Sequence, residues 1–126
     1  MRNQENLEMD LWYLSQMIYY IDTTFERLEF AKRSALSVND EMVIDSLAMN
    51  VGQIGEQLDS EKLSMEVRNK YPDVPWKMIK GFRNLAYHSY GSVDAKMLLG
   101  IVTKDLAELR EQLEVIIKDL KREIEL

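Results

Sequence analysis

Three long segments of this chain place apolar residues at alternating intervals of three and four, and this spacing limits the fold more than any other feature. On a helix with 3.6 residues per turn, such spacing aligns the apolar side chains along one face. The segments cover approximately residues 6–29, a stretch that begins after Asn39 or Asp40, and a stretch from Asp94 toward Ile124. Their apolar positions are Leu7, Leu11, Leu14, Ile18, Ile21, Phe25 and Leu28; Ile44, Leu47, Val51, Ile54 and Leu58; and Val102, Leu106, Leu109, Leu113, Ile116 and Leu120. The sequence therefore predicts an all-α, up-and-down helical bundle of three long and one or two short helices.

Two prolines organise the connection between the second and last long helices. A short helix is predicted over residues 64–70, and Pro72 ends it because proline lacks a backbone N–H. Pro75 is suited to the first turn of a further short helix, where that N–H is not needed. Trp76 is expected to anchor the start of this helix as part of the core, with a platform for base stacking as the less favoured alternative.

Two glycines inside the second long helix are unfavourable for helix stability. Gly52 and Gly55 are therefore expected to permit the close approach of another helix, and Glu56 is expected either to face solvent or to support a nearby site. Aromatic residues flank the apolar stripe of the first helix and are interpreted as packing at its rim or as a contact with a second copy or a partner protein. These residues are Trp12, Tyr13, Tyr19 and Tyr20.

Composition limits the class of protein. At 126 residues the chain is expected to form a single helical domain over residues 1–126. It contains no Cys, has no apolar signal-peptide core and has no stretch long enough to span a membrane, so we expect a cytoplasmic protein. Its net charge of −6 argues against a broad, sequence-independent nucleic-acid surface.

One segment departs from this acidic character. Between Val74 and Val93 there is no Asp or Glu, although the chain contains 22 acidic residues, and three Lys or Arg and the single histidine lie there instead. A polyanion such as RNA would therefore meet least repulsion in this segment.

The residue types in the segment favour chemistry that needs no metal. One His and no Cys exclude a zinc site of the usual kind, and no cofactor is expected. His88 can transfer a proton near neutral pH, Arg83 offers a planar cation that matches phosphate oxygens, and Asn84 can orient the imidazole or bind phosphate. Metal-free RNA cleavage needs such groups: a base for the 2′-hydroxyl, an acid for the leaving 5′-oxygen, and a cation for the phosphorane.

The spacing of these residues raises a geometric difficulty. On an ideal α-helix Asn84 and His88 lie one turn apart, as do Arg83 and Tyr87, whereas Arg83 and His88 are separated by about 140°. A common site then requires a wide cleft, a loosened helix end near His88, or a second chain. Acid and base catalysis by two histidines also needs two chains, so a twofold homodimer is expected.

The same segment resembles a known family. Arg83, Asn84, His88 and Tyr90 form an Arg-x4-His-x-Tyr pattern similar to the signature of HEPN domains, specifically the HepT-like toxins. The residues 54–56 resemble the Ile-Gly-Glu helix of that family, and the resemblance as a whole extends over residues 46–109. Two more elements match the family: the turn Tyr71-Pro72-Asp73-Val74-Pro75-Trp76, and Val93-Asp94 at the start of the last helix.

The resemblance implies a homodimeric, metal-independent endoribonuclease with Arg83, Asn84 and His88 at the cleft between subunits. It further implies a toxin–antitoxin pair, in which a minimal nucleotidyltransferase antitoxin transfers AMP to Tyr90. Lys80 and Tyr87 are expected to support the site or to bind the RNA substrate.

Two other functions remain open from the sequence. A non-catalytic helical module that binds nucleotides or pairs with a nucleotidyltransferase would fit the acidic composition well. A structural coiled-coil adaptor is disfavoured because it gives no reason for the acid-free segment.

Overall fold

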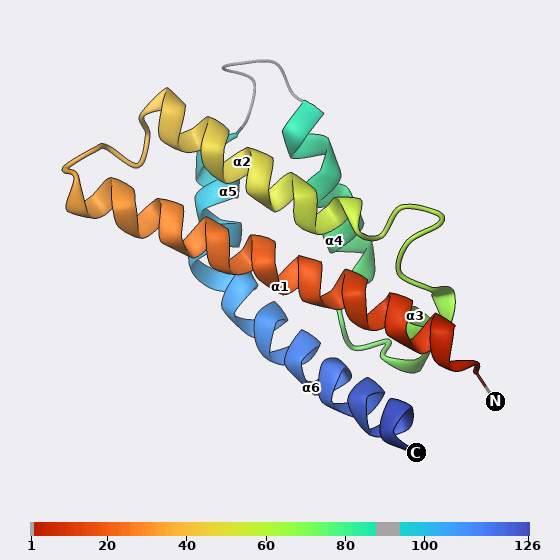
Figure 1. Cartoon of the computed structure of the whole chain (residues 1–126). Coiled ribbons are helices and arrows are strands. Elements are labelled where there is room, and N and C mark those ends of the chain that lie inside the picture. Colours follow the sequence, from red (N-terminus) through yellow and green to blue (C-terminus); the bar gives the residue numbers. More distant parts are fainter. Residues whose placement is uncertain (1, 88–93) are drawn as a thin grey trace.

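All regular structure in the described residues is helical. The computed structural model describes residues 2–87 and 94–126, and no strand occurs in these two ranges (Figure 1). The elements are α1 (Gln4–Arg33), α2 (Glu41–Glu56), α3 (Met65–Lys70), α4 (Trp76–Phe82), a 3₁₀ segment (Arg83–Tyr87), α5 (Ala95–Gly100), a π-helical turn (Ile101–Asp105) and α6 (Leu106–Glu125). The last three follow one another without a break and form one long helix. The predicted all-α architecture with three long and two short helices is confirmed.

The predicted helix starts agree with the capping groups. Asp40 accepts a hydrogen bond from the backbone N–H of Met42 at 2.9 Å, and Asp94 accepts one from Met97 at 3.1 Å. These side chains occupy backbone donors that have no partner inside their helices. Pro75, predicted in the first turn of a helix, instead precedes α4 as its N-cap residue. The carbonyl oxygen of Pro75 still accepts the first helical hydrogen bond of α4.

α1 continues past the predicted end at residue 29 and closes with a left-handed residue. Ala35 has a φ of 57°, a conformation usually taken by glycine. The backbone N–H of Leu36 donates to the carbonyl of Ala31 at 2.9 Å, and that of Ala35 donates to Lys32 at 3.3 Å. These bonds satisfy carbonyl groups at the end of α1, so they hold Ala35 in an unfavourable conformation.

The buried face of α1 differs from the predicted one. Leu7, Leu14, Ile21 and Leu28 are buried as predicted, but Leu11, Ile18 and Phe25 are only partly buried. The positions that complete the buried stripe are Asp10, Met17, Thr24 and Ala31. Two of these are polar, so the spacing of apolar residues alone does not include them. Asp10 tolerates burial because its carboxylate accepts hydrogen bonds from the backbone N–H and hydroxyl of Ser64 and pairs with Arg2.

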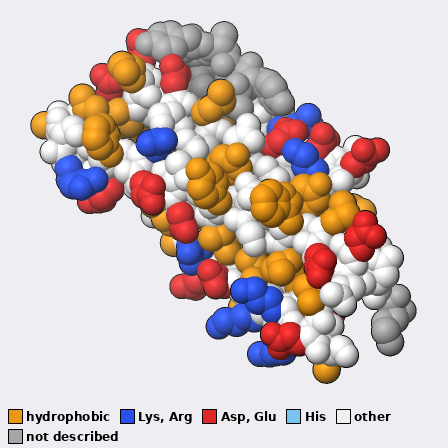
Figure 2. Space-filling model, in the orientation of Figure 1, with side chains coloured by type: hydrophobic (Ala, Val, Ile, Leu, Met, Phe, Trp, Pro, Cys, Tyr) orange, Lys and Arg blue, Asp and Glu red, His pale blue; other side chains and the backbone are white. Residues whose placement is uncertain are grey.

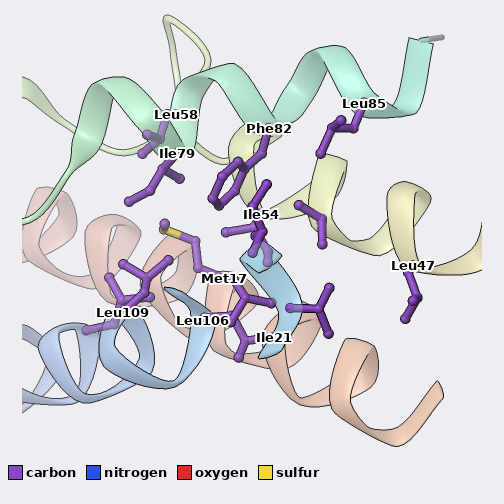
Figure 3. Packing of buried hydrophobic residues seen from close by; sticks show 14 of the residues in the cluster. Met17, Ile21, Leu47, Ile54, Leu58, Ile79, Phe82, Leu85, Leu106 and Leu109 are labelled. Atoms are coloured by element: carbon purple, nitrogen blue, oxygen red, sulfur yellow. The ribbon is translucent and has the colours of Figure 1, made fainter. Parts of the chain in front are cut away.

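α1 lies between α2 and α6, and α4 packs against α2 (Figure 1). The predicted apolar positions of the second and last long helices are all buried. Figure 3 shows Ile79, Phe82 and Leu85 pointing from α4 and the 3₁₀ segment into this core, toward side chains of α1, α2 and α6. The core therefore fixes the position of the helix that precedes the signature residues.

The aromatic residues flanking the stripe of α1 divide into two groups. Trp12 and Tyr19 are exposed, whereas Tyr13 and Tyr20 pack partly against the core. Figure 2 shows hydrophobic side chains gathered over α1 and α2 on one face of the molecule. In the part of the chain that the structure describes, no helix is both long and apolar enough to cross a membrane.

Candidate functional site

The close contact between α2 and α4 depends on Gly55. A Cβ atom at this position would lie 2.5 Å from the carbonyl oxygen of Ile79 and 2.7 Å from the backbone nitrogen of Arg83. Both are backbone atoms, so neither can rotate away. The prediction that a glycine here permits helix–helix approach is confirmed for Gly55, and Gly52 is also buried. The contact brings the end of α2 directly beside Arg83.

Arg83 is held by carboxylates at that end of α2. Its Nε donates to Oε2 of Glu56 at 2.8 Å, and its Nη1 lies 3.5 Å from Oδ1 of Asp59. Glu56 also lies 3.6 Å from the ammonium of Lys62. Arg83 is 35% exposed and Glu56 is 22% exposed, so the pair is partly shielded from water. Glu56 thus fixes the direction of the guanidinium, as one of its two sequence interpretations anticipated.

The helix changes its winding at Arg83. α4 ends at Phe82, and the segment Arg83–Tyr87 is a 3₁₀ helix with about three residues per turn. The predicted one-turn relation of Arg83 and Tyr87 assumed α-helical geometry and is wrong for this segment, because residues three apart share a face there. A loosened helix end was one of the expected alternatives, but near His88, whereas the winding changes already at Arg83.

The other predicted site residues are only partly placed. Lys80 is exposed on α4, and Asn84 is exposed in the 3₁₀ segment. Tyr87 is placed at the end of that segment. His88 and Tyr90 lie outside the described residues, so their relation to Arg83 stays a prediction.

Comparison with known proteins shows the family to which the chain belongs. The family model described as "Ribonuclease HepT-like" matches residues 17–116. The chain belongs to the HepT-like ribonuclease family of HEPN proteins. This membership confirms the resemblance found in the sequence, and the matched region contains α2, α4 and the Arg83 site.

Several relatives of this HepT-like protein are named as RNases. "Putative RNase MJ1380" of Methanocaldococcus jannaschii is 30% identical over 79 residues, which cover 63% of this chain and 71% of the relative. "Putative RNase MJ1216" of the same organism is 25% identical over 111 residues, covering 86% and 88%. "Putative RNase TTE0752" of Caldanaerobacter subterraneus is 30% identical over 84 residues, covering 67% and 73%. No solved structure matches the chain at a comparable level.

The Tyr-Pro turn of this HepT-like chain connects α3 to α4 and is hydrogen-bonded to α6. The hydroxyl of Tyr71 donates to Oδ2 of Asp119 at 2.6 Å, and the indole N–H of Trp76 donates to the carbonyl of Tyr71 at 2.9 Å. Burial, followed by the hydrogen bond to Asp119 and its charge, raises the pKa of Tyr71. Trp76 is thus a partly buried structural residue, in line with its predicted anchoring role.

A small cavity adjoins Asn84. It has a volume of about 340 Å³ and lies between α4 and α5, with Phe82, Leu85, Asp94 and Met97 among its lining residues. Its described walls are mainly apolar, and Asn84 and Asp94 are the polar residues among them. Among the described residues no three His, Cys, Asp or Glu side chains gather as metal ligands.

Asp59 was missed as a site residue by the sequence analysis. It follows Glu56 by three residues and pairs with the same arginine. The i, i+3 spacing of two acids beside the Ile-Gly-Glu motif is the signal that could have identified it.

Proposed function

We propose that this HepT-like chain is a metal-independent endoribonuclease that acts as a twofold homodimer. The observation that carries the proposal is the fixed guanidinium of Arg83, held by Glu56 in a protein whose relatives are named as RNases. A cation with a defined direction is suited to stabilise the charge that develops on a phosphorane. The pairing with Glu56 makes that direction independent of substrate.

The proposed reaction uses only side chains of the Arg-x4-His pattern. One His88 takes the proton from the ribose 2′-hydroxyl, and the 2′-oxygen attacks phosphorus as the bond from phosphorus to the 5′-oxygen breaks. The second His88 of the dimer protonates the leaving 5′-oxygen. The products are a 2′,3′-cyclic phosphate and a 5′-hydroxyl. Asn84 orients an imidazole or binds the phosphate.

The dimer follows from the chemistry of a chain with one histidine. Each subunit supplies a single His88, so two proton-transfer groups require two copies. Charge also favours a shared cleft, because the acid-free segment of each copy would face the same substrate.

Purified protein is expected to cleave RNA in the presence of EDTA. His88→Ala and Arg83→Ala should each abolish cleavage while circular dichroism shows an intact helical fold. An all-2′-deoxy substrate should resist cleavage, because it lacks the attacking hydroxyl. Cleavage that persists in His88→Ala, or that requires a divalent cation, would refute the proposed chemistry.

The regulatory part of the proposal concerns Tyr90. A minimal nucleotidyltransferase antitoxin would transfer AMP from ATP to the Tyr90 hydroxyl, releasing pyrophosphate. The added phosphate, two residues from His88, would repel the substrate phosphate. Mass spectrometry should show a gain of one or more AMP groups on the parent chain and none on Tyr90→Phe. Equal labelling of both proteins would contradict this assignment.

The alternative is a non-catalytic module that binds nucleotides or a nucleotidyltransferase. The net charge of −6 favours it, since such a charge opposes binding to long RNA. The EDTA assay separates the two functions, because the module would bind without producing a 2′,3′-cyclic phosphate.

A further inference from the structure

An open groove lies between α3 and α4. It has a volume of about 590 Å³ and is lined by residues of both helices and of the Tyr-Pro turn that joins them. The described residues that line it include Lys77, Lys80, Arg68 and Asn69, and none of the described lining residues is acidic. In a chain of net charge −6, a surface without carboxylates is suited to an anionic ligand.

Two lysines of α4 and the arginine that directly follows it form a series of cations along the chain. Lys77, Lys80 and Arg83 follow one another at intervals of three, and α4 itself contains no acid. At a rise of 1.5 Å per residue, the series extends roughly 9 Å along the helix from Lys77 to Arg83. Both lysines are exposed, and no ion pair to a described carboxylate occupies either one. Lys77 and Lys80 line the groove, and Arg83 follows three residues after Lys80, turned about 120° from Lys77 on an ideal helix.

The floor of the groove is rigid. The Nη2 of Arg68 donates to the carbonyl oxygens of Leu58 and Leu63 at 2.7 and 2.8 Å, which fixes its guanidinium between α3 and the preceding loop. The indole N–H of Trp76 is bonded to Tyr71, so this residue can offer only its ring to a ligand. Met65 and Trp76 add apolar surface beside the cations.

We propose that this groove binds the backbone of single-stranded RNA, with Lys77 and Lys80 contacting phosphates that flank the scissile one. The inference rests on the proposed nuclease function and assigns a substrate path to it. Cations combined with aromatic and apolar surface are the features that bind single strands, because an unpaired strand offers both phosphates and base faces. Double-helical RNA would present its phosphates but keep its bases stacked.

The test compares two double variants with the same change in charge. Lys77→Gln/Lys80→Gln removes the cations of the groove. Lys118→Gln/Lys121→Gln removes two exposed lysines with the same spacing from α6, a helix rich in Glu. Binding is measured with fluorescent 2′-O-methyl RNA, which cannot be cleaved through the 2′-hydroxyl, and melting curves verify that both variants fold.

The groove variant should bind about tenfold more weakly at low salt, as expected for two solvent-exposed charge contacts. When the logarithm of the binding constant is plotted against the logarithm of the salt concentration, the slope for the groove variant should be less steep by about 1.4. Each phosphate contact on a single strand contributes about 0.7 to that slope. The control variant should change affinity less than twofold. Equal weakening in both variants would show an effect of net charge alone and would overturn the inference, as would unchanged binding by the groove variant or no binding by the parent.

The same proteins separate this inference from the nuclease proposal. If the parent protein binds 2′-O-methyl RNA through the groove but leaves ordinary RNA intact, the groove proposal stands and the nuclease proposal is refuted. If the parent protein cleaves RNA and the groove variant binds RNA as tightly as the parent, the nuclease proposal stands and the groove proposal is refuted.

Discussion

Replacing Gly55 by alanine should destabilise the fold although alanine is the better helix former. The intrinsic preference of a helix favours Ala over Gly by about 1 kcal/mol. Against this, the new Cβ would meet the Ile79 carbonyl at 2.5 Å and the Arg83 nitrogen at 2.7 Å. Forcing such contacts apart typically costs about 1–3 kcal/mol, and here only movement of a whole helix relieves them. We expect a net loss of up to about 2 kcal/mol in the free energy of unfolding.

Gly81 supplies the matched control for this prediction. It lies in α4, and a Cβ there would meet nothing within 4 Å. Gly81→Ala should therefore gain up to about 1 kcal/mol through helix propensity. Urea unfolding at one protein concentration measures both changes. If Gly55→Ala is stabilised by as much as Gly81→Ala, the close packing of α2 against α4 is not what requires glycine. The Gly55 variant should also cleave RNA more slowly, because moving α4 separates Arg83 from Glu56.

Three further predictions follow from individual contacts. Glu56→Gln should lower kcat about tenfold, because the Arg83 guanidinium is then free to change direction. Asp59→Asn removes a longer and more exposed contact, so it should leave kcat unchanged and lower KM for RNA. Steady-state kinetics distinguish the two effects. Tyr71→Phe should lose about 1 kcal/mol of stability through its hydrogen bond. The pKa of Tyr71 is raised in the folded state, so its contribution to the free energy of unfolding is complete below the unfolded-state pKa of about 10 and declines as the pH rises further. In urea unfolding, the stability of the Phe variant should therefore fall less at alkaline pH than that of the parent. Ala35→Gly should raise the melting temperature, with a net gain of roughly 0.5 kcal/mol, because glycine adopts the positive φ without strain.

The sequence predicted those parts of the fold that depend on local patterns. The stripe of α2, the capping roles of Asp40 and Asp94, and the close approach at Gly55 each follow from residue type and spacing. The buried face of α1 was predicted only in part, because the polar residues Asp10 and Thr24 also lie on it. A buried carboxylate becomes acceptable only when its partners are known, and one of them, Ser64, is distant in sequence.

The same limit applies to the candidate site. The sequence proposes Arg83 as a site residue and a supporting role for Glu56, but it does not predict the 3₁₀ winding at Arg83 or the contact with Asp59. Both depend on how the end of α2 packs against α4. Periodicity along one helix contains no information about that packing.

The charges around Arg83 determine how the site can act on RNA. In the described ion pairs Arg83 and Lys62 balance Glu56 and Asp59, so these four side chains together carry no net charge and attract a distant polyanion weakly. Arg83 can stabilise a phosphate only in direct contact, which favours a role in the chemical step. In the binding path proposed above, attraction over a longer range comes from Lys77 and Lys80. If this division holds, added salt should raise KM for RNA while kcat changes little, because salt screens exposed charges more strongly than a partly shielded contact. A kcat that falls with salt as steeply as kcat/KM would show that attraction and catalysis depend on the same exposed cations.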